Sequence, residues 1–352
     1  MNLLDYYEAG TPAYILTHDF LGTPIAKTAH GILDYGEIFA VTGIIDRSQA
    51  GKKVKEVIPR LKKSADIPIF ADLNEAIKHK KAKVLILGVA APGGQIPESW
   101  RKDICLALQS GLDLIAGMHT FFSEDEEFSR IAEKSGSRII DLRKPPLDLT
   151  VAHQLVRQTN IKVALCLGTD CVVGKRTAAA ALYQKSKEQG QNSAFLATGQ
   201  TGLLLGCEAG VVIDRIPADF VAGQLEKMVL DLHNKGFEFV FAEGQGALLH
   251  PAYAGVTLSL LHGTDPQAVI LVHDPERKVR DAFDNPPLPM PGWQQERELI
   301  EKLSRAKVVA LVTWGEKKKK LLQDADLPVF DLTIDREKEL LLAELNKFWE
   351  NL

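Results

Sequence analysis

The chain has 352 residues, of which 45% are hydrophobic and 25% charged, and its formal net charge is −4. This length favours two domains over one, and the slightly negative charge argues against nucleic acid as the main partner. No apolar run reaches the roughly 20 residues that span a bilayer, and the first residues lack the basic segment of a signal peptide. Four cysteines without CxxC or zinc-like spacing are expected to be reduced thiols. We therefore expect a soluble, cytoplasmic protein with no membrane partner.

In the first half of the chain, short apolar runs alternate with amphipathic stretches. The runs are continuous rather than alternating, which predicts strands buried on both faces and hence a parallel α/β sheet. Helical patterns at 98–111 and 124–136 each end on glycine. The predicted strands are 13–19, 39–46, 67–72, 83–90, 113–118 and 138–142.

The loops of this first half give weaker signals. The segment "THDFLGTPIAK" (17–27) lacks G-x-G-x-x-G, so the Rossmann-like alternation alone gives little support for a dinucleotide site. Asp46, after the second strand, is a weak candidate for a ribose contact. The loops at 91–98 and 117–125 follow strands on the face where parallel sheets bind ligands.

A proline-containing polar segment at 143–150 separates two similar patterns. We place the domains at 1–146, Rossmann-like, and 147–352, P-loop NTPase-like. The proline-rich stretch 285–292 predicts a rigid surface loop, with a site-covering lid as the alternative. In the second half, strands are predicted at 161–167, 193–198, 237–243, 268–274 and 307–314, and helices at 175–189, 219–234, 293–305 and 335–350.

The segment "CLGTDCVVGKRT" (166–177) has the context of a phosphate-binding loop. A buried strand leads into it, Gly174-Lys175 follows a tight turn, and an alanine-rich helix comes next. Glycines let the backbone wrap anionic oxygens, lysine reaches the outer phosphates, and the helix N-terminus favours negative charge. The residues expected to bind the phosphates of a cofactor are Gly168, Thr169, Asp170, Gly174, Lys175, Arg176 and Thr177.

Two positions of this loop depart from G-x-x-x-x-G-K-[ST]. Thr169 stands where the first glycine is expected, and Arg176 stands where a hydroxyl would bind magnesium. Thr177 is rotated by roughly 100° on the helix, so it cannot simply replace that hydroxyl. Arg176 can itself neutralise phosphate charge. No metal ligand is therefore assigned.

Two further motifs follow predicted strands. Glu243 ends an apolar strand, where phosphate-loop folds position magnesium or water, and Gly244 and Gly246 then permit close approach of the backbone. Asp214 is a candidate general base or amine contact, whereas Asp219 has an alternative role as the N-cap of the next helix. The candidate substrate-binding residues are Gly199, Gln200, Thr201, Gly202, Arg215, Asp219, Gly244 and Gly246.

The motifs "GTDCVVGK" and "AEGQGAL" resemble those of the dethiobiotin-synthetase-like class of P-loop proteins, in which threonine also takes the first template position. With "ATGQTG" and "IDRIPADFVAG" in this order behind a small α/β domain, the chain resembles the D-glutamate N-acetyltransferase-like family, long catalogued as a domain of unknown function. The resemblance covers nearly the whole chain. That family also tolerates a non-hydroxyl residue after the lysine.

The resemblance implies transfer of acetyl from acetyl-CoA to the amine of an acidic amino acid, D-glutamate in particular. The loop would hold the phosphates of CoA. Either Glu243 or Asp214 would take the amine proton, and amides of 199–202 would stabilise the tetrahedral intermediate. Arg215 and Arg176 are the arginines placed to meet the substrate carboxylates.

Two other functions stay open at this level. An ATP- and Mg-dependent ligase of dethiobiotin-synthetase-like type would release ADP, although residue 176 lacks the magnesium-binding hydroxyl. A non-catalytic nucleotide-binding regulator would bind nucleotide without turnover. Proteins of this class often form homo-oligomers, but the sequence leaves the oligomeric state undetermined.

Overall fold

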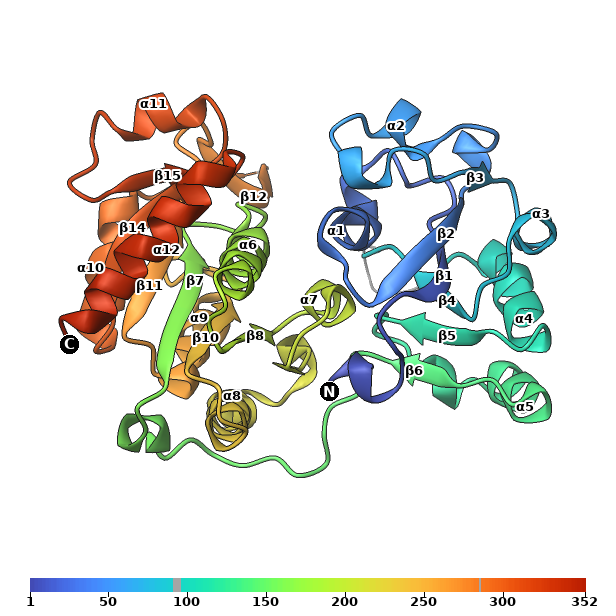
Figure 1. Ribbon diagram of the computed structural model, residues 1–352, viewed down its shortest axis with the longest axis horizontal. Coiled ribbons are helices and arrows are strands. Elements are labelled where there is room, and N and C mark those ends of the chain that lie inside the picture. The colour runs from blue at the N-terminus through green and yellow to red at the C-terminus, as the bar shows by residue number, and fades with distance from the viewer. Residues whose placement is uncertain (91–95, 285) are drawn as a thin grey trace. The chain divides into compact units, whose positions relative to one another are not determined.

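The computed structural model describes residues 1–90, 96–284 and 286–352, and it forms two compact units (Figure 1). One unit is Met1–Pro145 with Leu203–Gly206, and the other is Pro146–Gly202 with Cys207–Leu352. Both contain a parallel sheet flanked by helices, which confirms the predicted fold class. Residues 91–95 of the predicted ligand-face loop 91–98 lie outside the described residues. Among the described residues, no helix combines the length and apolar character needed to cross a membrane.

The N-terminal unit contains a six-stranded parallel sheet with strand order β3-β2-β1-β4-β5-β6. This is the doubly wound order of Rossmann-type sheets. All six predicted strands are present, but shorter than the apolar runs suggested. Their bounds are β1 Thr11–Leu16, β2 Phe39–Ile45, β3 Ile69–Phe70, β4 Val84–Leu87, β5 Asp113–Ala116 and β6 Ile139–Asp141. The helices are α1 Lys27–Tyr35, α2 Val54–Val57, α3 Leu73–His79, α4 Arg101–Gln109 and α5 Glu126–Ser135.

Asp46 has a structural role in this unit. Its side chain is fully buried, and Oδ2 accepts hydrogen bonds from Thr17 Oγ1 and the Leu21 amide, both at 2.9 Å. Its other oxygen accepts from the amide and hydroxyl of Ser48. Because both oxygens are engaged, Asp46 fixes the turn after β1, and the hypothesis of a ribose contact is wrong for this arrangement.

The C-terminal unit contains a seven-stranded parallel sheet with order β15-β14-β11-β7-β10-β8-β9. The central strand β7 pairs with β10 and β11, with Glu243 opposite Cys166 and Val272 opposite Gly168, so the ends of these strands align. The strands are β7 Lys162–Gly168, β8 Ser193–Ala197, β9 Ala209–Gly210, β10 Phe239–Glu243, β11 Ala268–Val272, β14 Lys307–Thr313 and β15 Val329–Asp331. The helices are α6 Lys175–Glu188, α8 Ala218–Asn234, α9 Ala254–Thr264, α10 Trp293–Leu303, α11 Lys317–Leu321 and α12 Asp335–Glu350, while α7 Gln200–Leu205 begins in this unit and its last residues belong to the N-terminal one.

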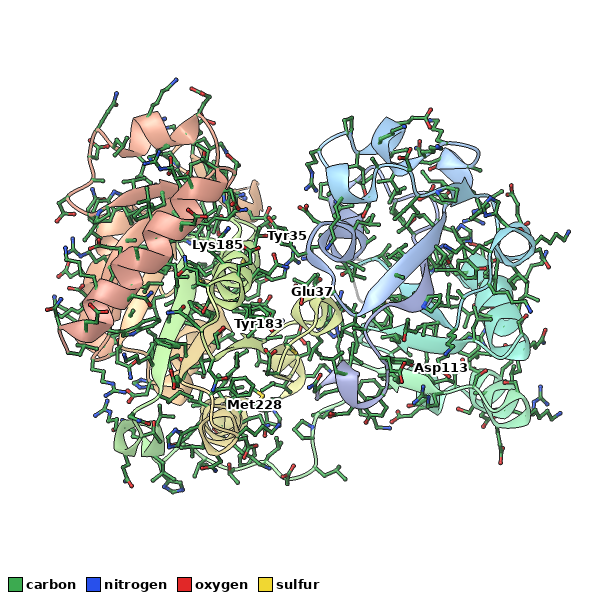
Figure 2. The ribbon with its side chains drawn as sticks, in the orientation of Figure 1. Tyr35, Glu37, Asp113, Tyr183, Lys185 and Met228 are labelled. Atoms are coloured by element: carbon green, nitrogen blue, oxygen red, sulfur yellow. The ribbon has the colours of Figure 1, made fainter. Side chains whose placement is uncertain are left out.

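Helix α6 follows the phosphate loop. Two of its side chains, Tyr183 and Lys185, bond neighbouring elements, and Figure 2 labels both. Tyr183 Oη donates to Glu208 Oε1 at 2.5 Å, beside β9. Lys185 Nζ bonds Asp335 Oδ2 at 2.9 Å, at the start of α12. Since α6 carries the loop at its N-terminus, these contacts also limit movement of the loop.

The proline-rich stretch is not a simple loop. β12 (Val279–Asp284) and β13 (Pro287–Pro289) pair antiparallel as a separate two-stranded ribbon. Proline has no amide to donate, which suits an edge of a two-stranded ribbon better than the middle of a sheet. The stretch 285–292 was predicted to be a rigid surface loop, and in its described part Pro287–Pro289 form a paired and largely exposed strand instead of a loop.

Candidate functional site

The predicted phosphate loop lies between the end of β7 at Gly168 and the start of α6 at Lys175. Gly174 precedes the helix with φ 105°, a conformation that L side chains rarely adopt. A Cβ on Gly174 would also lie 2.4 Å from the Trp314 ring. The first amides of α6 have no acceptor within the helix, and the helix dipole adds positive potential there. The loop thus ends on a backbone anion site that requires glycine.

Side chains bind every peptide oxygen from residue 169 to residue 173. Arg277 and Arg280 come from the segment after β11, and Trp314 follows β14. In a trans peptide the carbonyl and the next amide point in opposite directions. Each held oxygen therefore fixes the orientation of its peptide plane and, with it, the direction of the amide that follows. The donors, in chain order of the oxygens, are Arg280 Nη1 (3.4 Å), Lys175 Nζ, Arg277 Nη1 (2.7 Å), Arg277 Nη2 (3.4 Å) and Trp314 Nε1 (2.8 Å).

Asp170 anchors the loop. Its carboxylate is fully buried, and Oδ2 accepts from Arg277 Nη1 and from the Asp281 amide, both at 2.9 Å. These contacts tie the loop to residues 277–281. The structure therefore gives Asp170 a supporting position, whereas the sequence predicted a contact to the cofactor.

One group beside the loop has the spacing of a metal site. Side-chain atoms of Asp170, Cys171 and His250 lie within 4.8 Å of one another. However, the Ala252 amide donates to His250 Nδ1 at 3.2 Å, so a neutral ring carries its proton on Nε2, which faces Asp170 at 3.7 Å. Burial lowers the pKa of His250 and keeps the ring neutral. A proton on Nε2 disfavours ligation of a cation there, and the 3.7 Å between Nε2 and Asp170 Oδ1 is too long for a hydrogen bond.

Lys175 and Thr169 are both buried within the loop. The Lys175 ammonium donates to the carbonyl of Asp170. Burial lowers its pKa, and the nearby Cys171 and Asp170 act in the opposite direction. Thr169 Oγ1 lies 2.8 Å from His273 Nδ1, and burial lowers the pKa of His273 to about 4. A neutral imidazole therefore holds the first residue of the loop.

Glu243 lies at the end of β10, the strand next to β7, and is only 4% exposed. Its Oε2 accepts from the amides of Thr198 at 3.0 Å and Gly199 at 3.1 Å, just after β8. Gln245 Nε2 lies 3.4 Å from Oε1. Burial raises the pKa of Glu243, while the Arg176 guanidinium and the two amides lower it. Glu243 therefore joins three of the predicted motifs at one edge of the sheet.

The glycine-rich segment after β8 fits closely around this carboxylate. A Cβ on Gly202 would lie 2.4 Å from Glu243 Oε2 and 2.8 Å from Ala197 Cβ. Gln200 and Thr201, at the start of α7, are buried. Other predicted glycines serve packing: Gly244 lies against the carbonyl of Cys166, and Gly246 lies against Tyr253 and Thr257.

The remaining predicted site residues lie further out. Asp214 and Arg215 are exposed on a 3-10 turn, Ile213–Arg215, after the edge strand β9. That strand is three places from β7, roughly 14 Å at normal strand spacing. Asp219 is exposed in the first turn of α8, whose N-cap is Pro217, so the predicted N-cap role is wrong. Its charge still suits the helix N-terminus.

Several residues of this site gave no recognisable signal in the sequence. Arg277 and Trp314 lie in loops and Arg280 lies in β12, all more than 100 residues after the phosphate loop. Glu296, fully buried on α10, accepts from the amides of Leu248 and Leu249 and so fixes the segment that follows Glu243. From the sequence alone, a charged residue in a loop or on a helix is expected to be solvent-exposed, because its buried partners are not known.

Comparisons with known proteins match both domains of this chain. Residues 150–339 match the P-loop domain of DUF1611, described as a domain of unknown function, and residues 47–145 match its Rossmann-like N-terminal domain. A D-glutamate N-acetyltransferase of Tritonibacter scottomollicae is 39% identical over 267 residues, 76% of this chain and 74% of that protein. A protein of the same name from a Pseudoalteromonas species is 35% identical over 192 residues, 54% of this chain and 56% of that one. The crystal structure of a DUF1611 family protein from Anabaena variabilis ATCC 29413 superposes with a TM-score of 0.87 and 29% identity, covering 96% of this chain and 100% of that one.

Proposed function

The chain belongs to the DUF1611 family, and from this premise we propose that it is an N-acetyltransferase, transferring acetyl from acetyl-CoA to the amine of D-glutamate or a related acidic amino acid. Relatives that carry the name D-glutamate N-acetyltransferase support this function. One observation carries this proposal. The phosphate loop, the segment after β8 and the buried Glu243 all lie at the carboxyl ends of neighbouring strands, and Glu243 bonds the segment after β8.

In this proposal the phosphate loop holds the phosphates of CoA. The loop amides and the start of α6 bind phosphate oxygens, and Lys175 and Arg176 supply positive charge. The Lys175 ammonium bonds the Asp170 carbonyl. A phosphate oxygen would be the stronger, charge-assisted acceptor for the same ammonium.

Glu243 is the preferred general base. The substrate amine must lose a proton before it attacks the thioester, and a base with a raised pKa accepts that proton at neutral pH. The amine nitrogen then bonds the acetyl carbon, the C–S bond breaks, and the CoA sulfur takes the electron pair and a proton. Asp214 is exposed and further from the loop, which makes it the weaker candidate.

Fewer residues are candidates for the oxyanion donors and for the contact to the substrate carboxylates than the sequence implied. The Gly199 amide already donates to Glu243, so oxyanion donors within this segment are to be sought among the amides of 200–202. Arg215 is the candidate for the substrate carboxylates, because Arg176 acts on Glu243.

The test is thiol release from acetyl-CoA by the purified protein with D-glutamate, L-glutamate or no acceptor. We expect release that requires D-glutamate and is lost in Lys175→Ala. Lys187→Ala removes the same charge from an exposed position of the same helix and should keep activity. No release with any acceptor, or formation of ADP from ATP with these acceptors, would contradict the proposal and favour a ligase. Nucleotide binding without turnover would favour a regulator.

A further inference from the structure

Phosphate-loop proteins commonly bind magnesium between the hydroxyl that follows the loop lysine and an acid at the end of a neighbouring strand. In this chain those two positions hold Arg176 and Glu243. The residues at a magnesium position should be oxygen donors, since Mg²⁺ prefers six of them in octahedral geometry. The site has a guanidinium in one of the two places where a donor is needed.

The positive charge of the arginine influences the acid. α6, which carries Arg176 in its first turn, packs against β10, which ends on Glu243. Burial raises the pKa of Glu243, and the Arg176 guanidinium is the strongest of the opposing influences. The positive charge is thus already placed beside the strand-end carboxylate.

The neighbouring oxygens do not rebuild a magnesium site. Thr177 lies one residue further along α6, rotated by roughly 100° from the position of the missing hydroxyl. Asp170 has Oδ2 engaged with Arg277 and the Asp281 amide. Glu243 has Oε2 engaged with two backbone amides. One oxygen of each carboxylate is therefore engaged by the protein itself, which leaves a single oxygen of Asp170 and a single oxygen of Glu243 and no hydroxyl at position 176.

We propose that this loop binds its phosphate ligand without magnesium, and that the Arg176 guanidinium supplies the positive charge that the ion would otherwise bring to the phosphates. The inference rests on the proposed function only in requiring that the loop binds phosphate. A planar guanidinium can bond two phosphate oxygens at once, which a single ammonium cannot do in the same fixed geometry.

The experiment is calorimetric titration of the full chain with CoA and, separately, with ADP, each in EDTA and in excess MgCl₂. We expect the same Kd within about twofold in both buffers, because a ligand that needs no ion shows no linkage to it. A Kd that weakens tenfold or more in EDTA would overturn the inference, and it would leave the acetyltransferase proposal standing.

Two variants sharpen the test. Arg176→Thr restores the hydroxyl, and we expect its affinity in EDTA to fall by about tenfold or more, with partial recovery in magnesium. Arg336→Thr makes the same change at an exposed position of α12 and should behave as the parent chain. An Arg176→Thr variant that melts at the parent temperature and binds equally well in EDTA would overturn the role of Arg176. Magnesium-independent binding of ADP alone would support the inference while counting against CoA, and failure of both ligands to bind would overturn both proposals.

Discussion

Asp170 and Arg277 lie 107 residues apart in the chain, and the guanidinium donates to the buried carboxylate at 2.9 Å. The same guanidinium nitrogen donates to the carbonyl of Cys171. One side chain therefore both neutralises the buried acid and orients the loop backbone. This relationship makes the phosphate loop a preformed site, supported from the segment after β11.

Removal of Arg277 should destabilise the C-terminal unit more than removal of a surface partner. In Arg277→Ala a buried carboxylate loses its nearer counter-ion, at 2.9 Å, and keeps the Arg280 guanidinium at 3.9 Å, so the cost should approach but not exceed the roughly 3–5 kcal/mol of a buried charge left unpaired. Arg47→Ala breaks an ion pair to Asp19 whose side chains are 43% and 48% exposed, and it should cost under about 1 kcal/mol. Denaturant unfolding measures both changes. Adding Asp170→Asn to Arg277→Ala should recover part of the loss, and equal effects of the two single arginine variants would contradict this account.

Glu243→Gln should lower kcat by about 100-fold or more with little change in melting temperature. Glutamine retains an oxygen that accepts from the amides of Thr198 and Gly199, yet it cannot take a proton. The pH–rate profile of the parent should rise with an apparent pKa above the ordinary carboxyl value, because burial raises the pKa of Glu243. Asp214→Asn is the comparison. A larger kcat loss in Asp214→Asn would transfer the base role to that residue.

Gly202→Ala should reduce activity by displacing Glu243. The added Cβ would lie 2.4 Å from Oε2, which two amides hold in place, and 2.8 Å from Ala197 Cβ. Crowding of this kind costs about 1–3 kcal/mol. Gly255→Ala, in α9, adds a methyl group with no atom within 4 Å and should leave activity unchanged and stability equal or higher. Paired measurements of kcat and melting temperature decide the comparison.

His273 should make the C-terminal unit less stable in acid. Its pKa is about 4 in the folded protein and about 6.5 when unfolded. Above pH 6.5 both states are neutral. Between pH 6.5 and 4 the unfolded chain binds the proton first, so the free energy of unfolding falls by about 1.4 kcal/mol per pH unit. His273→Gln should flatten this dependence, whereas His119→Gln, at an exposed position, should not. Parallel pH profiles for the parent and His273→Gln would show that another group is responsible.

The sequence by itself determined the parts of this protein that depend on neighbouring residues. Continuous apolar runs predicted the buried parallel strands, and Gly174-Lys175 between a strand and an alanine-rich helix located the phosphate loop. Both follow from local chemistry, namely burial on two faces and the freedom of glycine at φ 105°. The position of Glu243 was predictable for the same reason, since an acid after an apolar run lies at the end of a strand.

Only the tertiary structure decided which side chains complete the site. The order of β14, β11, β7 and β10 brings Arg277, Arg280 and Trp314 onto the loop carbonyls, and this order arises from pairing between distant segments. Two predictions from local patterns were wrong. Asp46 is enclosed by the turn after β1 and does not face a ligand, and the N-cap of α8 is Pro217 and not Asp219. Polar side chains acquire their roles from the donors and acceptors that folding places around them. Burial of those partners is a property of the whole sheet, which no single stretch of sequence specifies.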